Sequence, residues 1–141
     1  MIFQKKDYIC ILDKNWNLMS HTLIKEGKYS YIEAGEGRPI ILLHGLMGTV
    51  SNFEGVLDHF SKIGYKVILP ELPLYTLPIL KTNVKNLSKF LKDFMAFKKI
   101  ENAILLGNSL GGHIGLYFTK LNLKNVDALV LAGSSGLYEK S

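Results

Sequence analysis

The fold of this 141-residue chain is decided by the stretch Leu105-Leu106-Gly107-Asn108-Ser109-Leu110-Gly111-Gly112-His113. It joins a buried apolar strand, predicted at 102–106, to a helix predicted at 110–121. The pattern Gly-x-Ser-x-Gly at such a junction is typical of a nucleophile elbow, a sharp turn that lifts a serine hydroxyl above the strand ends. Glycines at both flanks let the chain turn without a Cβ clash. Ser109 is therefore the candidate catalytic nucleophile, with Gly107 and Gly111 as its support.

The same turn places Ser109 at the start of a helix. There the backbone N–H of Leu110 and the helix dipole favour a developing negative charge. The alternative interpretation is a glycine-rich helix start with a serine that only caps it.

Strands and helices alternate on both sides of this stretch. Two short strands at 21–25 and 29–33 flank a turn and predict an antiparallel hairpin at one edge. The sequence then predicts strands at 39–43, 65–69, 102–106 and 126–132, helices at 52–63, 83–99 and 110–121, and a loop at 70–73. Short apolar runs between amphipathic helices predict an α/β fold: a mainly parallel sheet with helices on both faces.

A second motif follows the strand at 39–43. This strand runs directly into His44-Gly45-Leu46-Met47-Gly48. With both motifs in this order, residues 20–132 resemble the α/β-hydrolase superfamily. The resemblance implies that Leu46 and Leu110 supply two backbone oxyanion donors, and that His44 and Gly45 hold the loop. The alternative is that His44 is only a polar loop residue.

The resemblance also narrows the chemistry. Relatives that open epoxides or displace halide carry aspartate at the elbow, whereas a serine attacks an acyl carbon and leaves an acyl-enzyme for water to cleave. We expect a small-molecule substrate, either an ester, a thioester or a vinylogous carbon–carbon compound, and neither cofactor nor metal. The competing hypotheses are a non-catalytic binding module and a nucleotide-binding domain, and the latter lacks its glycine motifs.

No base for Ser109 is evident. The family places its acid and then its histidine after the serine, but His113 lies in the following helix, His21 and His59 lie upstream, and Asp127 lies inside a strand. We interpret residues 1–141 as a single partial domain that is inactive alone. A fragment, an interrupted gene and a non-catalytic half all fit.

The composition of the chain limits the classes of binding partner that we expect. The net charge of +5 comes from scattered lysines and one arginine, a distribution that does not favour nucleic acid. No apolar run is long enough for a membrane span. A lone cysteine, Cys10, and the lack of a secretory signal pattern predict a cytoplasmic location. The apolar strand at 126–132 would lose its family neighbour, so homo-oligomers through this sheet edge are expected.

Overall fold

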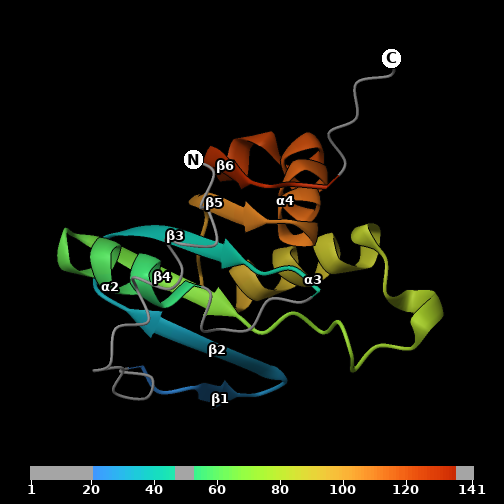
Figure 1. Ribbon diagram of the computed structural model, residues 1–141, viewed down its shortest axis with the longest axis horizontal. Helices are drawn as coiled ribbons and strands as arrows, with labels where there is room; N and C mark the ends of the chain where they lie inside the picture. Colours follow the sequence, from blue (N-terminus) through green and yellow to red (C-terminus); the bar gives the residue numbers. More distant parts are fainter. Residues whose placement is uncertain (1–20, 47–52, 136–141) are drawn as a thin grey trace, which may run out of the picture.

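The computed structural model describes residues 21–46 and 53–135. They form one six-stranded sheet in the order β1-β2-β4-β3-β5-β6 (Figure 1). The strands are β1 (Ile24–Glu26), β2 (Tyr29–Ala34), β3 (Arg38–Leu43), β4 (Tyr65–Pro70), β5 (Ala103–Asn108) and β6 (Val126–Ala132). The helices are α2 (Glu54–Lys62), α3 (Val84–Phe97) and α4 (Leu110–Leu121), with single 3-10 turns η2 (Ile79–Lys81) and η3 (Leu123–Asn125).

The four strands β4, β3, β5 and β6 are parallel to one another, whereas the β1–β2 hairpin joins the sheet antiparallel to β4. Strand β3 lies at the centre, and its apolar residues from Ile40 to Leu43 are buried. In the β3–β5 register Leu43 lies opposite Gly107. Because parallel strands end at the same edge of a sheet, the ends of β3 and β5 bring both sequence motifs together.

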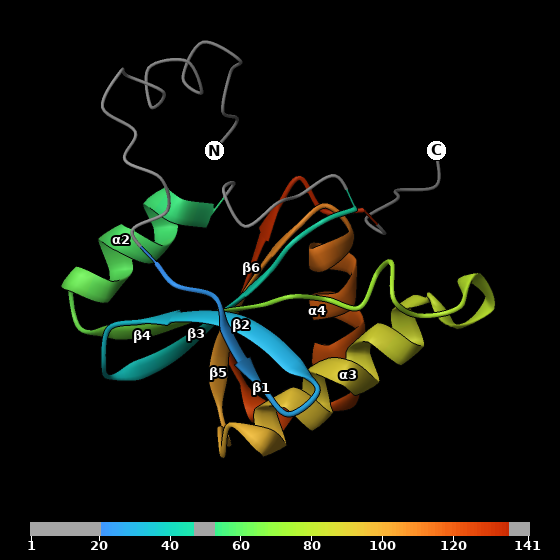
Figure 2. The same cartoon turned by 90° about the horizontal axis from the view of Figure 1, so that it is seen from below.

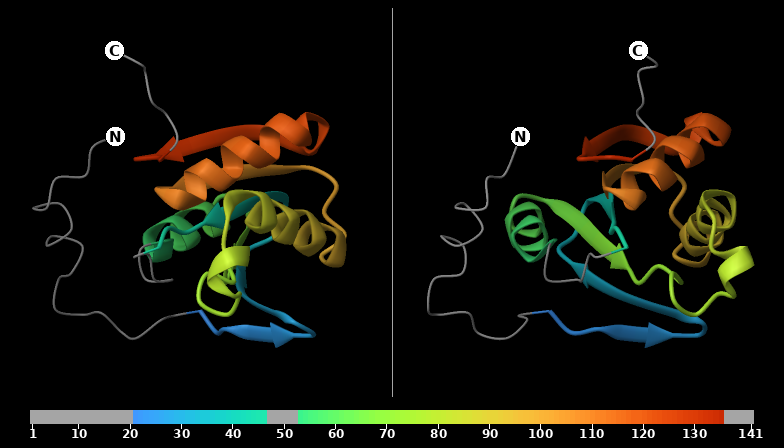
Figure 3. Two further views of the ribbon diagram at one scale, coloured as in Figure 1. Left: turned by 90° about the vertical axis from the view of Figure 1, so that its right-hand side faces the viewer. Right: turned by 45° about the vertical axis from the view of Figure 1, so that its right-hand side comes forward.

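Helices cover both faces, as the sequence predicts. Helix α2 lies on one face, and α3 and α4 lie on the other (Figures 2 and 3). The α3/α4 face holds the larger apolar core, which includes Leu91, Leu105 and Phe118. The α2 face holds a smaller core around Leu42, Leu57 and Val67.

Strand β6 ends the sheet, and side chains on both of its faces are exposed or half-buried. A register shift between Ala103 and Ile104 leaves Asp127 as an extra residue in β6. Its carboxylate pairs with Arg38 Nε at 3.1 Å. The bulge thus directs the one acidic side chain of this strand toward β3.

A polar cluster ties the end of α3 to β2. Lys98 Nζ lies 2.7 Å from a Glu33 carboxylate oxygen and donates a hydrogen bond to the Tyr31 hydroxyl at 3.1 Å. Burial alone would raise the pKa of Glu33, but the ammonium groups of Lys98 and Lys66 lower it below its usual value. Burial would lower the pKa of Lys98, yet contact with Glu33 and Tyr31 raises it.

The element boundaries differ from the predicted ones in a few places. Pro70 was expected in a loop, but it is the last residue of β4 and lies opposite Tyr31. A proline is tolerated at a strand end because its fixed φ suits extended backbone. His21 was expected in a strand and instead precedes β1. Asn52, the first residue of the helix predicted at 52–63, lies outside the described residues, as does Cys10.

Candidate active site

The strand-to-helix turn at the end of β5 holds Ser109 in a strained backbone conformation. Its φ is 53° and its ψ is −118°, in the left-handed half of conformational space that non-glycine residues rarely adopt. The Ser109 N–H donates to the Ala132 carbonyl at 3.1 Å, and the Ser135 N–H donates to the Ser109 carbonyl at 3.2 Å. The end of β6 therefore braces this turn from one side.

The two glycines of the elbow are required by close packing. A Cβ on Gly111 would overlap the carbonyl oxygen of Leu43, so α4 begins directly against β3. A Cβ on Gly107 would lie 2.5 Å from backbone atoms of Gly111 and Gly112. The structure thus explains both glycines by the contact of backbone with backbone, which fixes where Ser109 points.

Gly45 brings the loop after β3 against the serine. A Cβ on Gly45 would lie 3.0 Å from the Ser109 Cβ and 3.4 Å from its Oγ. The next residue, Leu46, is 51% exposed. Within the described ranges, no hydrogen bond occupies the backbone N–H of Leu46 or of Leu110. Two N–H groups that bond to no described residue therefore lie on the two segments that converge on Ser109.

His44 is buried and engaged through both ring nitrogens. The Leu72 N–H donates to Nε2 at 3.0 Å, and Nδ1 lies 3.0 Å from the Gly45 carbonyl oxygen. A backbone N–H can only donate and a carbonyl can only accept, so the ring carries its proton on Nδ1 and is neutral. Because both ring nitrogens have partners, neither is free to accept a proton from Ser109, and the role of His44 in holding the loop stays a prediction.

Tyr75 is a site residue that the sequence does not reveal. It lies in the segment between β4 and η2, and its side chain is largely exposed. Its hydroxyl donates to the Leu46 carbonyl at 2.5 Å. No motif marks this tyrosine, and the only available signal is its place between Pro73 and Pro78 in a segment that follows a central strand.

The imidazole rings of the other described histidines make no hydrogen bond to Ser109. His21 pairs with Asp58 of α2 at 2.6 Å. His59 packs edge-on against Phe60, with ring centroids 5.1 Å apart. His113 follows one helical turn after Ser109, and its backbone N–H donates to the Ser109 carbonyl at 3.3 Å, but no hydrogen bond joins its ring to Ser109. Among the residues that the structure describes, a base for Ser109 is therefore absent.

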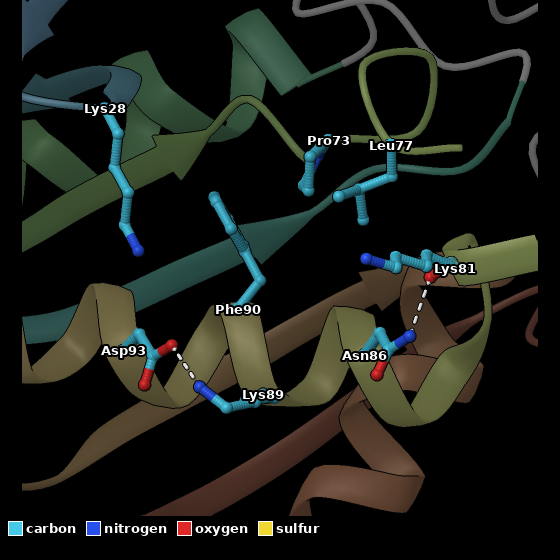
Figure 4. Close-up of a pocket in the computed structure, with 8 residues that line it drawn as sticks. All are labelled: Lys28, Pro73, Leu77, Lys81, Asn86, Lys89, Phe90 and Asp93. Carbon is cyan, nitrogen blue, oxygen red and sulfur yellow. Dashed lines mark hydrogen bonds and ion pairs between the residues drawn. The ribbon is translucent and has the colours of Figure 1, made fainter. Parts of the chain in front are cut away.

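A separate pocket lies on the outer side of α3. It encloses about 500 Å³ and is lined by Lys28, Pro73, Leu77, Lys81, Asn86, Lys89, Phe90 and Asp93 (Figure 4). Lys89 is paired with Asp93 at 2.8 Å, which leaves Lys28 and Lys81 as further cations on its rim. Ser109 does not line this pocket. The segment from Pro73 to Leu77 forms part of its wall and also carries Tyr75.

Nowhere in residues 21–46 and 53–135 do three histidine, cysteine or acidic side chains gather as they would around a metal ion. Over the same ranges, every helix is too short or too polar to cross a lipid bilayer.

Comparison with protein families gives a match over most of the chain. Residues 38–139 match the model of a family described as having an alpha/beta hydrolase fold. A crystal structure of MGS-MChE2, an alpha/beta hydrolase enzyme from the metagenome of lagoon sediments at Mar Chica, Morocco, superposes with a TM-score of 0.80. It is 58% identical over 84% of this chain and 54% of that chain.

Curated relatives show lower identity. A 2-hydroxy-6-oxo-6-(2'-aminophenyl)hexa-2,4-dienoic acid hydrolase from Metapseudomonas resinovorans is 33% identical over 76% of this chain and 39% of its own length. A 2-hydroxy-6-oxononadienedioate/2-hydroxy-6-oxononatrienedioate hydrolase from Comamonas testosteroni is 34% identical over 74% of this chain and 39% of its own. The chain thus spans about two fifths of the length of these relatives.

Proposed function

The chain belongs to the α/β-hydrolase family, and from that premise we propose that Ser109 is the nucleophile of a hydrolase that works through an acyl-enzyme. The observation that carries the proposal is the strained Ser109 turn, which is packed against Gly45 and lies beside two segments whose N–H groups bond to no described residue. A strained backbone held by its surroundings is a common property of reactive residues.

In the proposed reaction Ser109 Oγ attacks the carbonyl carbon of the substrate. A base takes the hydroxyl proton, and the carbonyl oxygen becomes an oxyanion next to the N–H groups of Leu46 and Leu110. The bond from this carbon to the leaving group then breaks, and the leaving group takes the proton. Water repeats the attack on the acyl-enzyme and releases an acid and free Ser109.

The base and its acid partner lie outside the described residues in this proposal. His44 is neutral and bonded through both nitrogens, and His21 is paired with Asp58. The whole protein is therefore the active species, whereas residues 1–141 alone have little or no turnover. Loss of a triad partner typically removes several orders of magnitude of rate.

The proposed substrate is a small carbonyl compound with a leaving group that can accept a proton. The curated relatives hydrolyse 2-hydroxy-6-oxo-dienoates, according to their names, and these compounds carry a ketone at the sixth carbon. We extend this class to the whole protein, together with simple esters and thioesters. No cofactor or metal takes part, and the cytoplasm is the proposed location.

A serine-reactive fluorophosphonate probe tests the nucleophile. The whole protein should be labelled at Ser109, and Ser109→Ala should lose the label completely. Ser61→Ala is a matched control, because Ser61 lies in α2 and bonds only to the Asp58 carbonyl. Absence of labelling in the whole protein, with the fold intact, would favour a binding module that reuses the fold without catalysis.

A further inference from the structure

We infer that Tyr75 and His44 together lock the orientation of the Leu46 peptide N–H, so that Tyr75 is a positioning residue for oxyanion stabilisation. The inference rests on the proposed function, because it concerns the donor assigned there to Leu46. Nothing in the sequence motifs assigns a role to Tyr75.

The first lock acts on the peptide before Leu46. This planar unit consists of the Gly45 carbonyl and the Leu46 N–H, which point in opposite directions. His44 Nδ1 holds the Gly45 oxygen at 3.0 Å. The direction of the Leu46 N–H is therefore fixed by the imidazole, which is in turn held by the Leu72 N–H.

The second lock acts on the Leu46 carbonyl. The Tyr75 hydroxyl donates to the Leu46 carbonyl oxygen. With the Gly45 carbonyl and the Leu46 carbonyl both held, the backbone of Leu46 has little freedom left. A donor that is already oriented needs no reorganisation when charge develops, and this preorganisation is what makes such donors effective.

Both locks originate in one segment, the stretch from Leu72 to Tyr75 after β4. Leu72 is buried and supplies the N–H to His44, whereas Tyr75 is 81% exposed and supplies the hydroxyl. The exposed Tyr75 side chain contributes little to the core, so the effect of its hydrogen bond to Leu46 can be measured separately from folding stability.

Tyr75→Phe in the whole protein tests the inference, because it removes one hydroxyl and keeps the ring. With p-nitrophenyl acetate we expect kcat to fall about tenfold and KM to change less than twofold, since the donor stays present but is less well oriented. The melting temperature should not move. Tyr65→Phe is the matched control, because Tyr65 begins β4 and its hydroxyl bonds to no described residue. The kcat of this variant should equal that of the unmodified protein.

A spectroscopic measurement gives an independent result. The amide resonance of Leu46 should shift in Tyr75→Phe but not in Tyr65→Phe, because only the first substitution removes a bond to the Leu46 carbonyl. Unchanged kcat and an unchanged Leu46 amide in Tyr75→Phe would overturn the inference. A fall in kcat that is matched by an equal rise in KM would also overturn it, because it would indicate that Tyr75 contacts the substrate.

The Ser109→Ala variant separates the two proposals. If it retains hydrolysis, the proposed nucleophile is wrong whatever Tyr75 does. If it loses hydrolysis while Tyr75→Phe retains full kcat, the nucleophile stands and the positioning role of Tyr75 is wrong.

Discussion

The two faces of the sheet differ in how completely they are covered. On the α3/α4 face, Leu105 is fully buried beneath two helices. On the opposite face α2 reaches β4 and β2, and the neighbouring residue Leu106 is only half-buried. Val130 of β6, on that same open face, is 45% exposed. The packed face is also the one on which α4 and its elbow rest, so the site is built on the better-packed side.

The largest expected effect is at the contact of α4 with β3. Gly111→Ala should destabilise the protein by about 3 kcal/mol or more, because the new methyl group overlaps the Leu43 carbonyl and backbone must move. Gly111→Val should be worse. Chemical denaturation measures the change.

Gly55→Ala is the matched control on the open face. It lies in the first turn of α2 with nothing within 4 Å of the added methyl group. The substitution should be neutral or stabilise by about 0.5 kcal/mol, because alanine favours the helix. Equal effects at the two glycines would show that the elbow is not closely packed.

Substitutions of two consecutive leucines in β5 allow a direct comparison of how much each face of the sheet contributes to stability. Leu105→Ala should cost about 3 kcal/mol, because it opens a cavity under α3 and α4. Leu106→Ala should cost about 1 kcal/mol, since this side chain already contacts solvent. Urea unfolding of both variants measures the difference, and similar costs would mean that the open face is covered in solution.

The polar cluster at the margin of the packed face predicts a smaller, pH-dependent effect. Burial would raise the folded-state pKa of Glu33, but contact with Lys98 and Lys66 lowers it. The ionised Glu33 carboxylate therefore stabilises the folded state at pH values above its unfolded pKa of about 4.3. It is lost as the pH falls through the lower folded value. Lys98→Met should therefore destabilise at pH 7, and its penalty should shrink in acid.

Urea unfolding at pH 7 and in acid measures this penalty. Lys92→Met is the control, because Lys92 is exposed on α3 and makes no described ion pair. A Lys98→Met penalty that stays constant with pH would contradict the role of Glu33.

The smallest effect on stability is expected at the free edge. Val130→Lys should change the unfolding free energy by less than about 0.5 kcal/mol. It should nevertheless reduce self-association, since β6 contains no lysine or proline that would block pairing with a second copy. In an antiparallel pairing centred on Leu129, each Asp127 would face Leu131 rather than its own copy.

Sedimentation velocity over a concentration series measures the association of residues 1–141. Ile24→Lys on β1 is the control, because that edge is only three residues long and already carries Lys25 and Glu26. A monomer at every concentration, before any substitution, would contradict the proposed edge-to-edge assembly.

The order of the elements was predictable from sequence because most strands are short apolar runs and the helices carry apolar stripes. The two motifs were predictable because close contact between backbones requires glycine, as at Gly111, and a glycine is recognisable in the sequence. Tyr75 and Leu72 left no such signal. Their contacts depend on the path of an irregular segment between Pro70 and Pro78, which no periodicity describes. The position of Pro70 in β4 depends on pairing with a distant strand.

The contact between Gly111 and Leu43 has a consequence for the order of folding. Leu43 and Gly107 are paired neighbours in the sheet but are separated by most of the described chain. An isolated peptide with the sequence of β5 and α4 would contain every residue of the elbow motif and nothing to hold its strained serine. The reactive geometry can arise only after β3 has paired with β5 across an intervening segment that contains α2, β4 and α3, and contacts between residues so far apart in sequence form slowly. Nascent or partly folded chains would therefore carry a relaxed, unreactive serine.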